Sequence, residues 1–256
     1  MPFQNGLYYY AYHPQDKDRV PLVLIHGAGG DHLHWPVQIR RLSGFRIYAL
    51  DLPGHGKSGG HGLQQIENYA QAVINWLNEM HIPKAILVGH SMGSAIALWM
   101  GIHHPQRVLG LGLLGSGPRL PVDPTLLEET GYPSTFPNAV EKIIRRSFSR
   151  STERKLVETA KERMLETRPS VLHGDFLACE KFNIAGQLPQ ISAPAMILCG
   201  EDDKMIPCRL SKQLAEGIAD ADLEIIPEAG HMLMIEKPEA LASQLRPFLE
   251  DLSERW

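Results

Sequence analysis

The sequence contains little cysteine and no long apolar run, and its charges nearly balance. Three cysteines occur among 256 residues, and none stands in the C-x-x-C spacing of metal or redox sites. No run of about 18 or more apolar residues is present, so no segment is expected to span a membrane. A formal net charge of −4 gives no electrostatic reason to expect a nucleic-acid or anionic-membrane partner.

The cysteines and the N-terminal segment give indications of the cellular compartment of the protein. Cys179, Cys199 and Cys208 are too scattered for a disulfide framework, which fits a reducing compartment. The segment MPFQNGLYYYAY lacks the basic and then apolar regions of a signal peptide. We therefore expect a cytoplasmic protein. Its composition, 43% hydrophobic and 21% charged, is that of an ordinary globular chain.

Short apolar runs alternate with helical patterns along most of the chain. Strands are expected at 20–27, 45–51, 85–90, 107–116, 193–200 and 221–227, an edge strand near 7–13, and helices at 63–80 and 237–252. Continuous apolar strands separated by helices favour a mostly parallel sheet covered on both faces. The expected fold class is therefore α/β.

One region interrupts this alternation. Residues 118–189 contain no strand-like run, and three segments, at 137–148, 152–167 and 170–182, have helical periodicity and more charge. We interpret residues 118–189 as a helical cap inserted into a core made of 1–117 and 190–256.

The segment KAILVGHSMGSAIALWM places a serine where an apolar strand becomes a helix. Gly89-His90-Ser91-Met92-Gly93 fits the G-x-S-x-G pattern, in which a sharp strand-to-helix turn exposes the serine above the sheet edge. A Cβ atom at Gly89 or Gly93 is expected to collide with the neighbouring strand or helix. Ser91 is the predicted nucleophile.

A serine nucleophile needs a base and an acid that orients the base. His231 follows the last predicted strand, in PEAGHMLMIEKP, and fits the chain order serine, acid, histidine. The segment GEDDKMIP, after the preceding strand, offers Glu201, Asp202 and Asp203. Asp203 is the preferred acid, and Asp202 is its nearest rival. His26, His55 and His90 flank glycines and are expected to hold loop geometry through hydrogen bonds.

An oxyanion formed during acyl transfer needs two N–H donors. Met92, directly after the nucleophile, supplies one backbone N–H, and Ala28 in the loop His26-Gly27-Ala28-Gly29-Gly30 is the candidate for the other. This glycine-rich loop matches neither phosphate-binding pattern, G-x-G-x-x-G or G-x-x-x-x-G-K-[ST]. Phosphate binding is therefore a poor interpretation of the loop.

These motifs together identify a resemblance. With HGAGG, DLPGHGKS, GHSMGS, GEDDKMIP and EAGHM in family order, the chain resembles the α/β-hydrolase superfamily over nearly its full length. The resemblance implies an eight-stranded sheet with helices on both faces, a helical cap, a Ser-Asp-His triad, and neither a cofactor nor a metal. It implies that Asp51 stabilises a turn. Small carboxylesterases, enol-lactonases and the related synthase of menaquinone biosynthesis are the most similar branches.

The expected activity is that of a serine hydrolase which cleaves a small-molecule carboxylic ester or lactone through an acyl-enzyme on Ser91. Ser91 argues against the relatives that use aspartate as nucleophile. One alternative is a C–C bond hydrolase or lyase that uses the same triad for proton transfer. A second is a non-enzymatic homologue that only binds a small ligand, because one fold hosts many functions.

Overall fold

The computed structural model describes residues 3–256. Its centre is an eight-stranded sheet of order β1-β2-β4-β3-β5-β6-β7-β8. The strands are β1 (Phe3–Gln4), β2 (Leu7–Tyr12), β3 (Val20–Ile25), β4 (Phe45–Leu50), β5 (Ala85–His90), β6 (Val108–Leu114), β7 (Ala195–Gly200) and β8 (Ala221–Ile226). The pairs β1–β2 and β2–β4 are antiparallel, and all the other pairs are parallel. The expected mostly parallel sheet is confirmed; the two-residue β1 is too short to leave a sequence signal.

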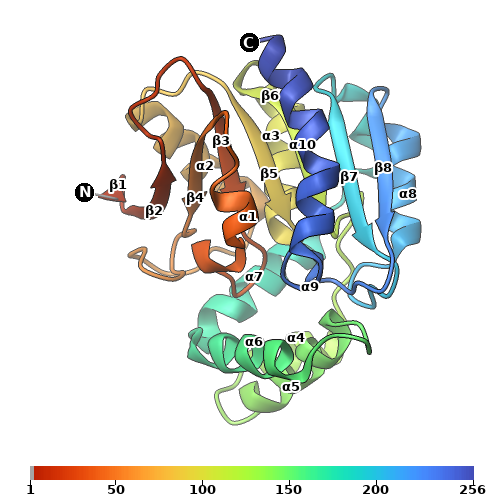
Figure 1. Cartoon of the computed structure of the whole chain (residues 1–256). Helices are drawn as coiled ribbons and strands as arrows, with labels where there is room; N and C mark the ends of the chain where they lie inside the picture. The colour runs from red at the N-terminus through yellow and green to blue at the C-terminus, as the bar shows by residue number, and fades with distance from the viewer. Residues whose placement is uncertain (1–2) are drawn as a thin grey trace.

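Helices cover both faces of this sheet (Figure 1). One face packs on α2 (Ile66–Glu79), α3 (Met92–His103) and α8 (Cys208–Gly217), and the other on α1 (Val37–Arg40) and α10 (Pro238–Glu254). Alternate residues of one strand enter opposite cores, as Leu87 and Val88 do in β5. The central strands β3 and β5 are buried at every position. Their uninterrupted apolar runs follow from this burial on two faces.

Four helices lie between β6 and β7 in the chain, which we call the inserted helices. They are α4 (Pro124–Thr130), α5 (Phe136–Ser147), α6 (Arg154–Glu166) and α7 (Pro169–Lys181). The last three agree with the helical segments expected from periodicity, whereas α4, begun by the Asp123 cap and Pro124, escaped the sequence analysis. In Figure 1 the inserted helices lie beyond the carboxyl ends of the parallel strands, with α7 nearest the sheet.

The remaining short elements connect the sheet and its helices. They are the 3₁₀ turns η1 (His32–His34), η2 (Pro105–Arg107) and η3 (Ala185–Gln190) and the short helix α9 (Leu233–Glu236). No helix within residues 3–256 combines the length and the hydropathy that crossing a bilayer requires. The loops that follow β3, β5, β7 and β8 all leave the same edge of the sheet, because these strands run parallel. They bring together the residues considered next.

Candidate active site

Ser91 occupies the turn between β5 and α3 in a strained backbone conformation. Its φ of 53° and ψ of −115° are rare for a residue with a side chain, and such a conformation costs about 1–3 kcal/mol. A Cβ on Gly93 would lie 2.7 Å from the carbonyl oxygen of His26 and closer still to that of Ile25, while one on Gly89 would strike the main chain of Gly93. The expected collisions at both glycines are thus confirmed. The turn is so tight that neither position has room for a side chain.

Asp203 and His231 meet at the edge of the sheet. His231 Nδ1 lies 2.7 Å from Asp203 Oδ2, and both side chains are buried. The other carboxylate oxygen, Oδ1, accepts hydrogen bonds from the backbone N–H groups of Met205 and Ile206, at 2.8 Å each. A carboxylate that accepts from Nδ1–H leaves Nε2 of His231 without a proton, which is the tautomer that a general base needs.

Asp202, the rival acid, points elsewhere. Its Oδ2 accepts from Ser149 Oγ at 2.5 Å, and its side chain is exposed. Glu201 is exposed as well. Within GEDDKMIP, therefore, Asp203 is the carboxylate placed on His231. The sequence already favoured Asp203 over Asp202, but the backbone of the loop determines which of three adjacent acids turns inward.

The His231 ring lies beside the serine turn. Its centroid is 4.7 Å from that of His90, whose Nε2 donates to the backbone oxygen of His231 at 2.9 Å. Burial, together with repulsion from His231, holds the pKa of His90 well below 6.5, so the ring is neutral. No hydrogen bond joins Ser91 to His231 among residues 3–256; catalytic hydrogen bonds are often long before a substrate binds.

Glu236 is a half-buried carboxylate that the sequence analysis missed. It accepts from the backbone N–H groups of Gly230 and Ser149 at 2.9 Å each, and so ties the loop before His231 to the inserted helices. Burial raises its pKa despite these bonds. The available signal was that Glu236 is the one acid in the segment HMLMIEKP.

The loop after β3 approaches the serine from the other side. A Cβ on Gly27 would lie 3.1 Å from Ser91 Cβ, so only glycine permits this approach. Within residues 3–256, neither the Ala28 N–H nor the Met92 N–H donates a hydrogen bond to the protein. Unpaired backbone donors are rare where a chain is closely packed, and they are typical of sites that bind an acceptor.

His26, His55 and Asp51 hold loops through hydrogen bonds, as expected. His26 Nε2 accepts from the Leu52 N–H at 3.0 Å, so its Nδ1 carries the proton that is donated to the Gly27 oxygen. Burial and the nearby His55 hold the pKa of His26 well below 6.5. Asp51 Oδ1 accepts from both the N–H and the ring Nδ1 of His32, and Oδ2 accepts from the Lys57 N–H. Asp51 therefore closes a turn.

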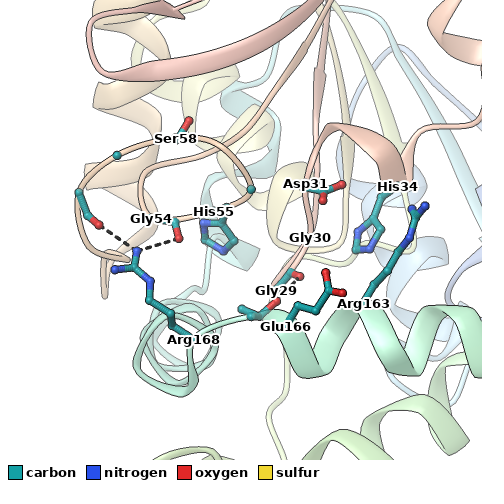
Figure 2. A pocket seen from close by; sticks show the side chains of 14 residues that line it. Gly29, Gly30, Asp31, His34, Gly54, His55, Ser58, Arg163, Glu166 and Arg168 are labelled. Atoms are coloured by element: carbon teal, nitrogen blue, oxygen red, sulfur yellow. Dashed lines mark hydrogen bonds between the residues drawn. The ribbon is translucent and has the colours of Figure 1, made fainter.

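A cavity of about 490 Å³ opens beside the 27–30 loop (Figure 2). The 54–60 loop forms one wall, and the other consists of Arg163 and Glu166 at the end of α6 and Arg168 just before α7. Residues 3–256 contain no cluster of three or more His, Cys, Asp or Glu side chains arranged to hold a metal ion. The chemistry available at the sheet edge is thus that of a serine, an oriented imidazole and two free N–H donors.

This combination defines a class of protein, an α/β protein with a serine at the strand-to-helix turn and an acid–histidine pair on the loops that follow. The family model of the alpha/beta hydrolase fold matches residues 20–238. The chain belongs to the α/β hydrolase fold family, and it is a hydrolase of that fold.

Two curated relatives and a solved structure show the range of similar proteins. The chain is 29% identical over 250 residues to the dihydrolipoyllysine-residue acetyltransferase component of the acetoin cleaving system of Pseudomonas putida, covering 90% of this chain but 63% of that protein. It is 28% identical to the pimeloyl-[acyl-carrier protein] methyl ester esterase of Pectobacterium carotovorum, covering 90% and 94% of the two chains. A solved thermophilic esterase is 28% identical, with a TM-score of 0.83 over 96% of this chain and 94% of that one.

Proposed function

We propose that this protein is a serine hydrolase that cleaves a small-molecule carboxylic ester or lactone through an acyl-enzyme on Ser91. The observation that carries the proposal is the strained Ser91 turn beside an Asp203–His231 pair joined at 2.7 Å. The likeness to a methyl ester esterase and to a thermophilic esterase supports ester bonds as the substrate class.

The mechanism follows from the positions of these groups. His231 Nε2 takes the Ser91 proton as Oγ attacks the acyl carbonyl, and Asp203 holds the tautomer and stabilises the imidazolium. The N–H groups of Ala28 and Met92 stabilise the tetrahedral oxyanion, each contributing about 3 kcal/mol. His231 then protonates the leaving alkoxide. His231 deprotonates a water that attacks the acyl-enzyme. The bond between the acyl carbon and Ser91 Oγ then breaks, His231 returns the proton to Oγ, and the acid is released.

We also propose that residues 118–189 act as a cap over this site, with 1–117 and 190–256 as the catalytic core. The position of the inserted helices beyond the carboxyl ends of the strands supports this division (Figure 1), because substrates of open α/β folds bind in the crevice outside those ends. On this proposal the acyl group lies between the sheet edge and the inserted helices.

The test is hydrolysis of p-nitrophenyl esters from acetate to laurate by wild type, Ser91→Ala and Ser192→Ala. Ser192 is an exposed serine outside the site and serves as the matched control. Turnover that is lost in Ser91→Ala and kept in Ser192→Ala is expected, and the best chain length measures the acyl pocket. If wild type and Ser91→Ala are equally slow on every ester, ester hydrolysis is wrong. Lactones, C–C bond and lyase substrates, and finally ligand binding without turnover are then tested in that order.

A further inference from the structure

Gly29 is held by two residues of α7 and by Thr167, which follows the end of α6. Its N–H donates to Asp175 Oδ2 at 2.8 Å, and its carbonyl oxygen accepts from Thr167 Oγ1 at 3.1 Å. Leu172 Cδ1 lies 2.9 Å from the point where a Cβ would stand, and φ is +65°. We call Thr167, Leu172 and Asp175 the clamp. Both polar groups of one residue in the loop after β3 are thus bonded to a segment about 140 positions later in the chain.

The carboxylate of Asp175 is fully buried and is fixed by the core. Its Oδ1 accepts from the Tyr69 hydroxyl at 2.5 Å, and its Oδ2 accepts from His55 Nε2 at 2.8 Å. His55 Nδ1 faces the Pro53 carbonyl oxygen at 3.1 Å. Both ring nitrogens therefore face acceptors, which requires both to carry protons. Burial alone would lower the pKa of His55, but the charge of Asp175 and its hydrogen bond outweigh burial and raise it.

A neighbouring residue holds the second loop. Arg168 Nη2 donates to the carbonyl oxygens of Gly54 at 3.0 Å and Gly60 at 2.9 Å. Figure 2 shows the Arg168 side chain reaching across to the 54–60 loop, which carries His55, and Gly29 lying beside Glu166 at the end of α6. The start of α7 therefore contacts both loops that follow β3 and β4.

A buried ion pair is poor evidence of added stability, because removing two charges from water costs about as much as their attraction returns. What such a pair does supply is a defined position. The peptide group between Ala28 and Gly29 carries the N–H that Asp175 binds. Holding this peptide restricts ψ of Ala28 and thereby the direction of the neighbouring Ala28 N–H, which is the proposed oxyanion donor.

We propose that Asp175 is a positioning residue for the oxyanion loop, so that stabilisation of the transition state depends on the inserted helices remaining docked. This inference rests on the proposed function. It assigns a role to an acid on α7 that touches neither Ser91 nor His231. It also assigns Tyr69 and His55 to holding that acid in its orientation.

The experiment compares Asp175→Ala, Asp175→Asn and Tyr69→Phe with wild type, all well below their unfolding temperatures. Asp175→Ala removes the acceptor of the Gly29 N–H. Asp175→Asn keeps an oxygen in that position but loses the charge. Tyr69→Phe, the matched control, removes a buried hydrogen bond to the same carboxylate at the oxygen that does not bind Gly29.

An oxyanion donor that points in the wrong direction stabilises the transition state less, which lowers kcat. Binding of the substrate in the ground state is unchanged. For Asp175→Ala we expect kcat to fall roughly ten- to hundredfold, somewhat less than the loss of a whole donor, with KM within about threefold of wild type. A boronic acid, which forms a tetrahedral adduct on Ser91, should bind weaker by a similar factor, and the product carboxylate should bind equally well. Asp175→Asn should restore most of kcat, and Tyr69→Phe should lose less than Asp175→Ala. Unchanged kcat and boronate affinity in Asp175→Ala would overturn the proposal, as would a rise in KM alone.

Amide hydrogen exchange tests the clamp without any substrate. The Gly29 amide should exchange slowly in the wild type and faster in Asp175→Ala. If Asp175→Ala does not fold, the wild-type measurement decides: a Gly29 amide that exchanges as fast as an exposed loop overturns the proposal. Failure of the proposed function gives a different result. In that case Ser91→Ala and wild type hydrolyse every ester equally slowly, while the exchange rate of the Gly29 amide still shows whether the clamp forms.

Discussion

Replacing Gly93 by alanine tests whether backbone contact is what makes the serine turn. The new methyl group would lie 2.7 Å from the His26 carbonyl oxygen and nearer to that of Ile25, whereas ordinary contact begins at 3.4 Å. Relief at His26 alone needs a shift of 0.7 Å in main chain that leads out of β3, a strand hydrogen-bonded on both sides by β4 and β5. The carbonyl groups of Ile25 and His26 therefore cannot move aside as a flexible side chain can.

The magnitude follows from two opposing effects. Overpacking of a rigid site costs about 1–3 kcal/mol or more, and alanine regains about 0.5–1 kcal/mol over glycine inside a helix. Because two carbonyl groups are struck, we take the upper part of the first range and expect a net loss of about 2 kcal/mol in the free energy of unfolding. For a chain of this size this corresponds to a fall in Tm of about 4–8 °C.

Gly101→Ala is the matched control on the same helix. Its new Cβ would lie 3.2 Å from Leu111 Cδ1, the end of a flexible side chain that can move aside. We expect its stability to lie within about 0.5 kcal/mol of wild type. Urea unfolding of both variants measures the difference through the midpoint at constant slope. Equal midpoints for Gly93→Ala and Gly101→Ala would refute the reasoning.

Further predictions concern the proposed site and the buried histidines. Asp203→Asn should lower kcat by about 10³-fold or more, whereas Asp202→Asn should stay within a few-fold; steady-state kinetics decide, and the reverse order would exchange the two acids. His26 and His90 have pKa values lowered well below 6.5, so each contributes stability that is present above pH 6.5 and lost as the pH falls, at about 1.4 kcal/mol per pH unit. Urea unfolding between about pH 7 and 5 measures this slope, which His90→Gln should reduce; an equal slope in both proteins would show that His90 is not the cause. His55 has a raised pKa, so the stabilisation from its pair with Asp175 is fully present below pH 6.5 and lost as the pH rises through the folded-state pKa. The stability gap between wild type and His55→Gln should therefore narrow in alkaline solution, and a gap that widens would contradict the ion pair.

Local patterns were sufficient to predict the sheet and the place of the serine. β3 and β5 are continuous apolar runs because both of their faces are buried, and the run into Gly89 and Gly93 predicts the turn that the structure describes. The helix α4 was missed because its seven residues are too few to establish a helical period.

Contacts between distant segments could not be predicted in the same way. Cys199 and Cys208 looked scattered in the sequence, yet their Sγ atoms lie 2.8 Å apart across the loop that carries Asp203. Asp175 could be noted only as one of several acids on the inserted helices, and nothing in its neighbourhood along the chain indicates that it meets Gly29, His55 and Tyr69.

The sequence by itself determined the α/β class, the helical insertion, and the order of serine, acid and histidine, because each is carried by a short-range pattern of apolar residues and glycines. Only the tertiary structure decided that Asp203 rather than Asp202 faces His231, and that Asp175 holds Gly29. Burial forces a carboxylate to find donors wherever the fold brings them, and those donors come from segments that the sequence keeps far apart.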